Sequence, residues 1–203
     1  MQVKGETVSS TSTEGSDYTE RLRTLESARW KRVLDVQAPY RRSMRRLRLG
    51  HALEVGCGIG RVLSFLDDAV GVDHNADSVR VARERGLHAW TTEEWPQCGD
   101  ARLASFDSLV LAHVLEHVDE PTADDIIGEY LPYLRPSARL LLICPQERGY
   151  SSDATHVRFL DLAAMEATAR RAGFVPTRAS SFPFPRVAGR VFPYNEFVVT
   201  AAR

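Results

Sequence analysis

Residues 51–60 read HALEVGCGIG, and this stretch decides the fold. A short, mostly apolar run, residues 51–55 (HALEV), leads directly into a turn with glycine at positions 56, 58 and 60. A strand followed by a glycine-rich turn is typical of the first unit of a nucleotide-binding α/β sheet, because glycine lets the backbone approach a ligand closely. The third glycine of the GxGxxG pyrophosphate fingerprint is missing. We expect a strand, the turn, and a helix through Phe65.

The rest of the chain alternates short apolar runs with amphipathic segments. Strands are predicted at 69–73, 87–90, 106–112, 138–145, 175–177 and 196–202, and helices at 76–86, 120–136 and 160–174. Strands that alternate with helices of this length indicate a doubly wound α/β fold, with an open, mostly parallel sheet covered by helices on both sides.

Composition narrows the class of protein. The 203 residues are 43% hydrophobic and 26% charged with a net charge of −1, which indicates a globular domain and no global attraction to nucleic acid or an anionic membrane. The three cysteines form no CxxC pair, so a disulfide framework is not expected. Neither a secretory leader nor a membrane span is indicated, and we expect a cytoplasmic protein.

The first 49 residues differ in character from the rest. Residues 1–17 are rich in Ser, Thr, Gly and Glu and predict a disordered tail. Residues 18–49 are helical in pattern and carry Tyr18, Trp30 and Tyr40. With aromatic residues near the C-terminus they could form a lid that excludes water from a site in residues 50–203. Such aromatics are also typical of core packing.

Asp73 ends the second predicted strand, 13 residues beyond Gly60. A carboxylate at this place can accept hydrogen bonds from both hydroxyls of a ribose. The glycine turn and the carboxylate together predict a nucleoside cofactor.

Four ordered motifs point to a known family. LEVGCGIG (53–60), GVDHN (71–75), FDSLVLAHVLEHV (106–118) and LPYLRPSARLLLICP (131–145) resemble the successive motifs of class I S-adenosylmethionine-dependent methyltransferases. The likeness is to the small-molecule branch typified by ubiquinone-biosynthesis methyltransferases, and it covers residues 50–203. It implies a single seven-stranded, Rossmann-like sheet with an antiparallel C-terminal strand pair.

The resemblance also implies which residues contact S-adenosylmethionine. The glycine turn would lie against the methionine part, supported by Glu54, while Asp73 would hold the ribose and His74 would lie beside the adenine. The family often has an Asp after the third strand, where this chain has two threonines. The implied cofactor-binding residues are Glu54, Gly56, Cys57, Gly58, Asp73, His74, Thr91, Thr92, Ala112 and His113.

A second candidate site follows the fourth predicted strand. His113, Glu116 and His117 have the spacing H-x-x-E-H, which in zinc proteases requires a helix, whereas this segment begins at a strand end. Some relatives place E-x-x-E-H at this turn and bind a divalent ion; here His113 replaces the first Glu. With His156 after the fifth strand, the four predicted ligands (His113, Glu116, His117 and His156) would suit Mg²⁺, Mn²⁺ or Zn²⁺. A purely structural role for these histidines is the alternative.

The chemistry of methyl transfer suggests the acceptor. Alignment of acceptor and methyl group can supply about 7–11 kcal/mol, and the acceptor must then be made more nucleophilic. A phenol needs only a histidine base, and His113, His156 and His117 are the candidates, whereas a sugar hydroxyl is helped more by a metal ion. We therefore expect methylation of a hydroxyl on a small molecule, with a sugar or polyol favoured over a phenol or quinol.

Other functions remain open at this stage. An RNA methyltransferase, a nicotinamide-dependent oxidoreductase and a non-catalytic cofactor-binding protein fit parts of the pattern. The expected partner is a small hydroxyl-bearing molecule, with neither nucleic acid nor membrane, and the protein could be a homodimer.

Overall fold

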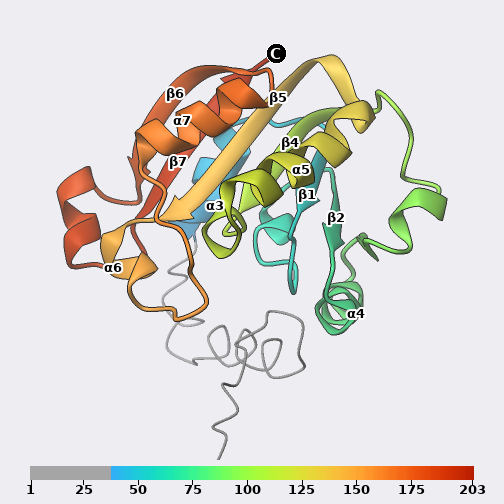
Figure 1. Ribbon diagram of the computed structural model, residues 1–203. Coiled ribbons are helices and arrows are strands. Elements are labelled where there is room, and N and C mark those ends of the chain that lie inside the picture. Colours follow the sequence, from blue (N-terminus) through green and yellow to red (C-terminus); the bar gives the residue numbers. More distant parts are fainter. Residues whose placement is uncertain (1–37) are drawn as a thin grey trace, which may run out of the picture.

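The computed structural model describes residues 38–203, which form one seven-stranded sheet of order β3-β2-β1-β4-β5-β7-β6 (Figure 1). The strands are β1 (Ala52–Val55), β2 (Ala69–Asp73), β3 (Ala89–Thr91), β4 (Phe106–Ala112), β5 (Leu134–Pro145), β6 (Val175–Phe182) and β7 (Glu196–Ala202). β1 to β5 pair in parallel, and β7 runs antiparallel to both β5 and β6. The predicted α/β sheet with an antiparallel C-terminal strand pair is confirmed.

Alternating side chains of the central strands build two cores, one on each face. Leu109 and Leu111 of β4 pack in a core on one face, whereas Val110 and Ala112 pack in a second core on the other. Because side chains alternate along a strand, a run of apolar residues such as this one must be covered on both sides.

Helices cover both faces (Figure 1). α5 (Glu120–Tyr130) and α7 (Leu162–Arg171) supply Ile127 and Met165 to the first core. α3 (Ala38–Arg46) and α4 (Ala76–Glu84) supply Met44 and Val79 to the opposite side. The short α6 (Glu147–Tyr150) follows β5. The side chains of three N-cap residues accept backbone N–H groups at the starts of α4, α5 and α7 and fix these starts: Asn75, Asp119 and Asp161.

The prediction of a helix from the glycine turn through Phe65 is wrong. Only a single 3₁₀ turn, η1 (Leu63–Phe65), follows the glycines. Gly56, Gly58 and Gly60 all have positive φ, so they cannot belong to a right-handed helix. Only six residues then separate Gly60 from Asp67, which leaves no room for an α-helix of ordinary length.

Other element boundaries also differ from the expectation; β6, predicted over 175–177, extends to Phe182. The helix predicted over 120–136 ends at Tyr130, and a 3₁₀ turn, η4 (Leu131–Tyr133), connects it to β5. Pro132 lacks the backbone N–H that a continued helix would need. β5 therefore begins four residues earlier than predicted.

The predicted tail, residues 1–17, and most of the predicted lid, including Tyr18 and Trp30, lie outside the described residues. Tyr40 of α3 packs against Phe65 and Phe182, with ring centroids 5.6 and 5.5 Å apart. Between residues 38 and 203 no helix is long and apolar enough to span a membrane.

The glycine turn yields a test of the fold. A Cβ at Gly56 would lie 2.3 Å from Cγ2 of Val114, whereas a Cβ at Gly86 would meet nothing within 4 Å, although both residues have φ above +70°. We expect Gly86→Ala to cost about 1–2 kcal/mol of unfolding free energy from backbone strain. Gly56→Ala should cost roughly a further 1–3 kcal/mol because Val114 must move. Urea denaturation measures the unfolding free energy of each variant. Equal losses in Gly56→Ala and Gly86→Ala would contradict the close contact with Val114.

Candidate active site

The carboxylate of Asp73 anchors the glycine turn at the carboxyl end of β2. Its Oδ2 accepts the backbone N–H of Gly58 at 2.7 Å, and its Oδ1 accepts the N–H of Asn75 at 2.8 Å. The residue is only 6% exposed. Each carboxylate oxygen can accept more than one hydrogen bond, so this group can still accept hydrogen bonds from a ligand's hydroxyls.

Glu54 lies nearby as a second buried carboxylate, in β1 beside the same turn. Its Oε2 has no hydrogen-bond partner among the residues that the structure describes. Burial raises the pKa of Glu54 to about 8, and the nearby Arg61 opposes this rise. A buried carboxyl without a partner is costly, and a cationic group beside it would stabilise its charged form.

The other predicted cofactor residues lie around these carboxylates, with different exposures. His74 is half exposed, with Nδ1 3.5 Å from Oδ1 of Asp73. Thr91 pairs with Asp73 across β2 and β3, and the N–H of Thr92 donates to the Asp73 carbonyl. Ala112 is buried at the end of β4. The thiol of Cys57 packs below the turn against Gly71, so only its backbone is placed for ligand contact.

His113 follows β4 with a left-handed backbone, φ +60°, which is unusual for a residue with a side chain. Its Nδ1 donates to Oε1 of Glu116 at 3.1 Å, and its Nε2 donates to Oε1 of Glu196 at 2.9 Å. Burial opposes a charge on this ring, but the two carboxylates outweigh burial and raise the pKa of His113 to about 9. At neutral pH the ring is therefore protonated and both nitrogens are occupied.

Sequence reasoning did not assign Glu196 or Arg61 to the site, and it considered Tyr40 only as part of a lid. Glu196 begins β7, is 6% exposed, and has Oε1 3.8 Å from Nη2 of Arg61. Burial and the facing Glu196 carboxylate raise the pKa of Tyr40 well above its ordinary value. The sequence signal for Glu196 was a lone acidic residue at the start of an apolar strand, 83 residues from its histidine partner.

Three of the four predicted metal ligands come together. One ligand atom from each of Glu116, His117 and His156 lies within 4.8 Å of the other two; we call these residues the ligand trio. His113 is not part of it. Glu116 is fully buried, and its Oε2 has no hydrogen-bond partner in the described part of the chain.

Backbone contacts explain how His156 reaches the other two residues. Glu116 and His117 lie in a 3₁₀ turn, η3 (Leu115–His117), directly after β4. The carbonyl of Glu116 accepts N–H groups from Val157 at 2.8 Å and Arg158 at 3.2 Å. This double hydrogen bond holds the loop after α6 against the turn, and His156 with it.

Hydrogen bonds also set which ring nitrogens of the trio are available. Nδ1 of His117 donates to the carbonyl of Thr155 at 3.2 Å, and Nδ1 of His156 donates to the carbonyl of Tyr150 at 2.8 Å. In the neutral rings this leaves the Nε2 lone pairs for a ligand or proton. Burial lowers the pKa of His117, and the charged His113 keeps the pKa of Glu116 below its ordinary value. Two neutral imidazoles and one carboxylate can bind a divalent cation.

An aromatic wall stands beside the trio. The ring of Tyr150 stacks on His156 with centroids 5.3 Å apart, and Phe159 meets Tyr150 edge-on at 5.3 Å. Phe159 remains 39% exposed, so this wall can contact an apolar molecule.

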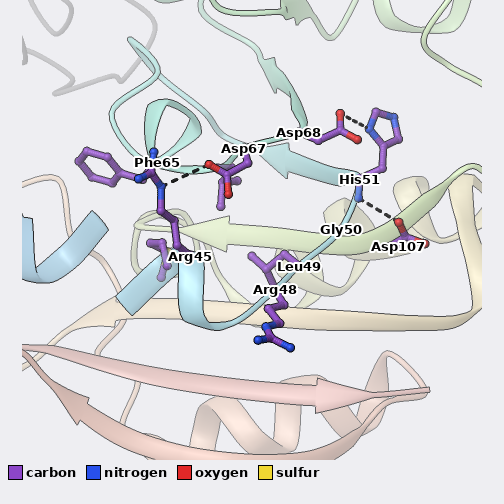
Figure 2. Close-up of a pocket in the computed structure, with 11 residues that line it drawn as sticks. Arg45, Arg48, Leu49, Gly50, His51, Phe65, Asp67, Asp68 and Asp107 are labelled. Atoms are coloured by element: carbon purple, nitrogen blue, oxygen red, sulfur yellow. Dashed lines mark hydrogen bonds and ion pairs between the residues drawn. The ribbon is translucent and has the colours of Figure 1, made fainter. Parts of the chain in front are cut away.

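A separate cavity of about 360 Å³ lies at the opposite edge of the sheet, before β1, β2 and β4 (Figure 2). Its charged groups pair with one another: Arg45 with Asp67 at 3.2 Å, and His51 with Asp68 at 2.8 Å. The backbone N–H of His51 also donates to Asp107. This cavity is remote from every predicted site residue.

Comparisons with known proteins show what the chain is similar to. The model of a methyltransferase domain family matches residues 53–140, which is less than half of the chain. No curated protein matches.

Solved methyltransferases share the fold. One from Thermotoga maritima, described as a possible histamine N-methyltransferase, has 17% identity and a TM-score of 0.64, over 91% of this chain and 97% of that one. The magnesium protoporphyrin IX methyltransferase of Synechocystis, with bound S-adenosylhomocysteine, has 15% identity and a TM-score of 0.63, over 94% and 96%. The 1,6-didemethyltoxoflavin-N1-methyltransferase of Burkholderia thailandensis has 18% identity and a TM-score of 0.56, over 99% and 93%. The substrates named for these proteins differ widely, so the shared fold does not specify a substrate for this chain.

The residues of the candidate site fit S-adenosylmethionine, the cofactor that the sequence resemblance implies. This molecule carries a ribose diol and an ammonium group. The site offers one carboxylate with spare acceptor capacity and another with a buried oxygen that has no partner among the described residues. Gly56, Gly58 and Gly60 have positive φ, a backbone conformation that glycine adopts without strain, and they add no side chains of their own to the turn.

Histidine titration tests the electrostatics of the candidate site. In metal-free buffer, NMR should give His113 a pKa near 9 and His117 a pKa below 6.5. Because the folded pKa of His113 is raised, its charge stabilises the fold fully below about pH 6.5, and this contribution is lost as pH rises through about 9. The His113→Gln variant assigns the signal. A His113 pKa at or below 6.5 would show that the two carboxylates do not hold it charged.

Proposed function

We propose that this protein is a methyltransferase that transfers the methyl group of S-adenosylmethionine to a hydroxyl of a small molecule, with the ligand trio activating that hydroxyl. The observation that carries the proposal is the trio itself, next to the end of β4. It joins one ionised carboxylate to two histidines whose Nδ1 atoms bond backbone carbonyls and whose Nε2 atoms have no hydrogen bond within residues 38–203. An uncharged amine is already nucleophilic, so methylation of its nitrogen needs neither a histidine base nor a metal ligand set. A hydroxyl gains most from them, because its proton must be removed for it to become a strong nucleophile.

On the cofactor side, we assign the ribose diol to Asp73 and the ammonium group to Glu54. When bound, the cofactor supplies an electrophilic methyl group on a sulfonium, which is displaced in line. The backbone of the glycine turn, from Gly56 to Gly58, would lie against the methionine part. We assign His74, Thr91 and Thr92 to the nucleoside end, because they lie beside Asp73 at the ends of β2 and β3.

On the acceptor side, we assign a divalent cation to Glu116, His117 and His156. When bound, such a cation supplies a positive charge that lowers the pKa of a neighbouring hydroxyl. This help matters most for a sugar or polyol hydroxyl, which is a much weaker acid than a phenol. His113 has a different role from the one expected: its protonated ring positions Glu116 and cannot serve as the base.

A phenol or quinol acceptor, with His156 as the base and no metal, is the second candidate. The aromatic wall of Tyr150 and Phe159 favours it, because a flat aromatic acceptor could pack there. Nε2 of His156 is the nitrogen left available to take the phenolic proton.

Replacing Asp73 tests the cofactor assignment. Asp73→Asn keeps the shape of the side chain but replaces one carboxylate oxygen with an NH₂ group. This donor would face a backbone N–H or a ribose hydroxyl in place of an acceptor. We expect the affinity for S-adenosylhomocysteine to fall about 10- to 100-fold by calorimetry, which corresponds to losing a charged hydrogen bond. Asp77→Asn, in the first turn of α4, is the matched control and should leave affinity unchanged. An unchanged affinity of Asp73→Asn would remove Asp73 from the cofactor site.

The metal assignment is tested by binding and by activity. Mn²⁺ titration should show one site in the parent protein, weakened at least about tenfold in His156→Gln and unaltered in His74→Gln. Methyl transfer from labelled S-adenosylmethionine to fractions of a small-molecule extract should stop with EDTA and return with a divalent ion. Transfer that persists in EDTA but is lost in His156→Gln would favour the phenol or quinol reaction. Mn²⁺ binding that is unaffected in His156→Gln would rule out the trio as a metal site.

A further inference from the structure

The connection between β6 and β7 exposes a group of large apolar side chains. Phe184 is 50% exposed, Val187 68%, Val191 76% and Tyr194 53%; we call these four residues the apolar tip. Val187 and Val191 are four residues apart in and directly after a 3₁₀ segment, η5 (Arg186–Arg190). Phe192 links the two aromatic members, with centroids 5.3 Å from Phe184 and 5.5 Å from Tyr194. In Figure 1 this connection projects from the sheet beside α6.

Hydrogen bonds and close packing hold the segment that carries the apolar tip, so the exposure of the tip does not come from a loosely packed loop. Nδ2 of Asn195 donates to Oε1 of Gln146 at 3.1 Å and to Oγ of Ser181 at 2.9 Å. Gly189 packs so closely on Gln146, and Gly149 so closely on the carbonyl of Pro193, that neither glycine has room for a Cβ. The fold therefore keeps these apolar side chains exposed to solvent, which is unfavourable in free energy. Such exposure indicates that they bind a partner.

The surroundings of the tip are basic. Residues 183–195 contain Arg186 and Arg190 and no acidic residue. In the adjoining α6, Arg148 is exposed, and Glu147 is already bound by Arg186 through two hydrogen bonds. The local charge is thus positive, although the net charge of the whole chain is −1.

We propose that the apolar tip docks this protein onto the surface of an anionic lipid bilayer. Valine and aromatic side chains at the end of a rigid projection can enter the boundary between headgroups and acyl chains, while the flanking arginines meet the anionic headgroups. A protein partner with a matching apolar face would not require the arginines. The net charge of the whole chain predicts no membrane partner, whereas this proposal rests on the local arrangement of charge and apolar surface.

Docking would orient the enzyme. β6 ends and β7 begins at the edge of the sheet where β4 and β5 also end, so the tip and the ligand trio belong to the same edge. The lipid surface would then lie next to the acceptor side of the molecule. Docking itself does not depend on which acceptor is methylated, and it is measured without catalysis.

Co-sedimentation with vesicles tests the proposal. We expect the full chain to partition onto vesicles of phosphatidylcholine with 25% phosphatidylglycerol at least about tenfold more strongly than onto phosphatidylcholine alone, and high salt should weaken the binding. Val187→Asp with Val191→Asp should reduce this partition about tenfold or more. Val175→Asp is the matched control, because Val175 is 69% exposed at the far end of β6, and it should bind as the parent does.

The charge contribution is tested separately. Arg148→Gln with Arg190→Gln should weaken binding to the anionic vesicles severalfold and leave binding to phosphatidylcholine unchanged. Lack of binding to anionic vesicles by the parent chain would overturn the proposal, and so would equal losses in Val175→Asp and the double aspartate variant. Sedimentation velocity without lipid supplies a further check: a parent dimer that becomes monomeric in the double aspartate variant would show that the tip is a self-association surface instead.

Discussion

The arrangement of the candidate active site depends on the two ion pairs of His113. This one ring joins the end of β4 to Glu116 in the following turn and to Glu196 in the last strand. Because the two carboxylates are almost fully buried, each would be costly without a positive partner. The left-handed backbone of His113 is compatible with the fold since both ring nitrogens are held in place. The turn that carries Glu116 and the strand that begins at Glu196 thus share one positive charge at the end of β4.

Much of the sheet follows from local sequence pattern. The apolar run at 52–55, the glycines after it and the carboxylate at 73 are near neighbours in the chain, and their spacing alone indicates strand, turn and second strand. The trio could also be anticipated in part, since Glu116 and His117 are adjacent and His156 follows the next strand. Parallel strands bring their carboxyl ends to one edge, so residues after β4 and β5 meet there.

The unpredicted features depend on distant parts of the chain. Glu196 reaches His113 only because β7 pairs with β5 in a particular register, and no local pattern encodes that register. The helix expected after the glycines does not form. Three glycines with left-handed backbone take up most of the connection between β1 and β2, and too few residues remain for a helix. The occupied nitrogens of His113 likewise depend on a carboxylate 83 residues away, which is why a base looked plausible at that position.

The position of β7 has a consequence for the newly made chain. It is the last strand in sequence, yet it lies between β5 and β6 in the sheet. During synthesis β5 therefore keeps an unpaired edge until residues 196–202 have left the ribosome, and β6 has no neighbouring strand before then. Glu196, the carboxylate that completes the His113 ion pairs, belongs to the same segment. Formation of the candidate site and closure of the sheet thus depend on the same strand.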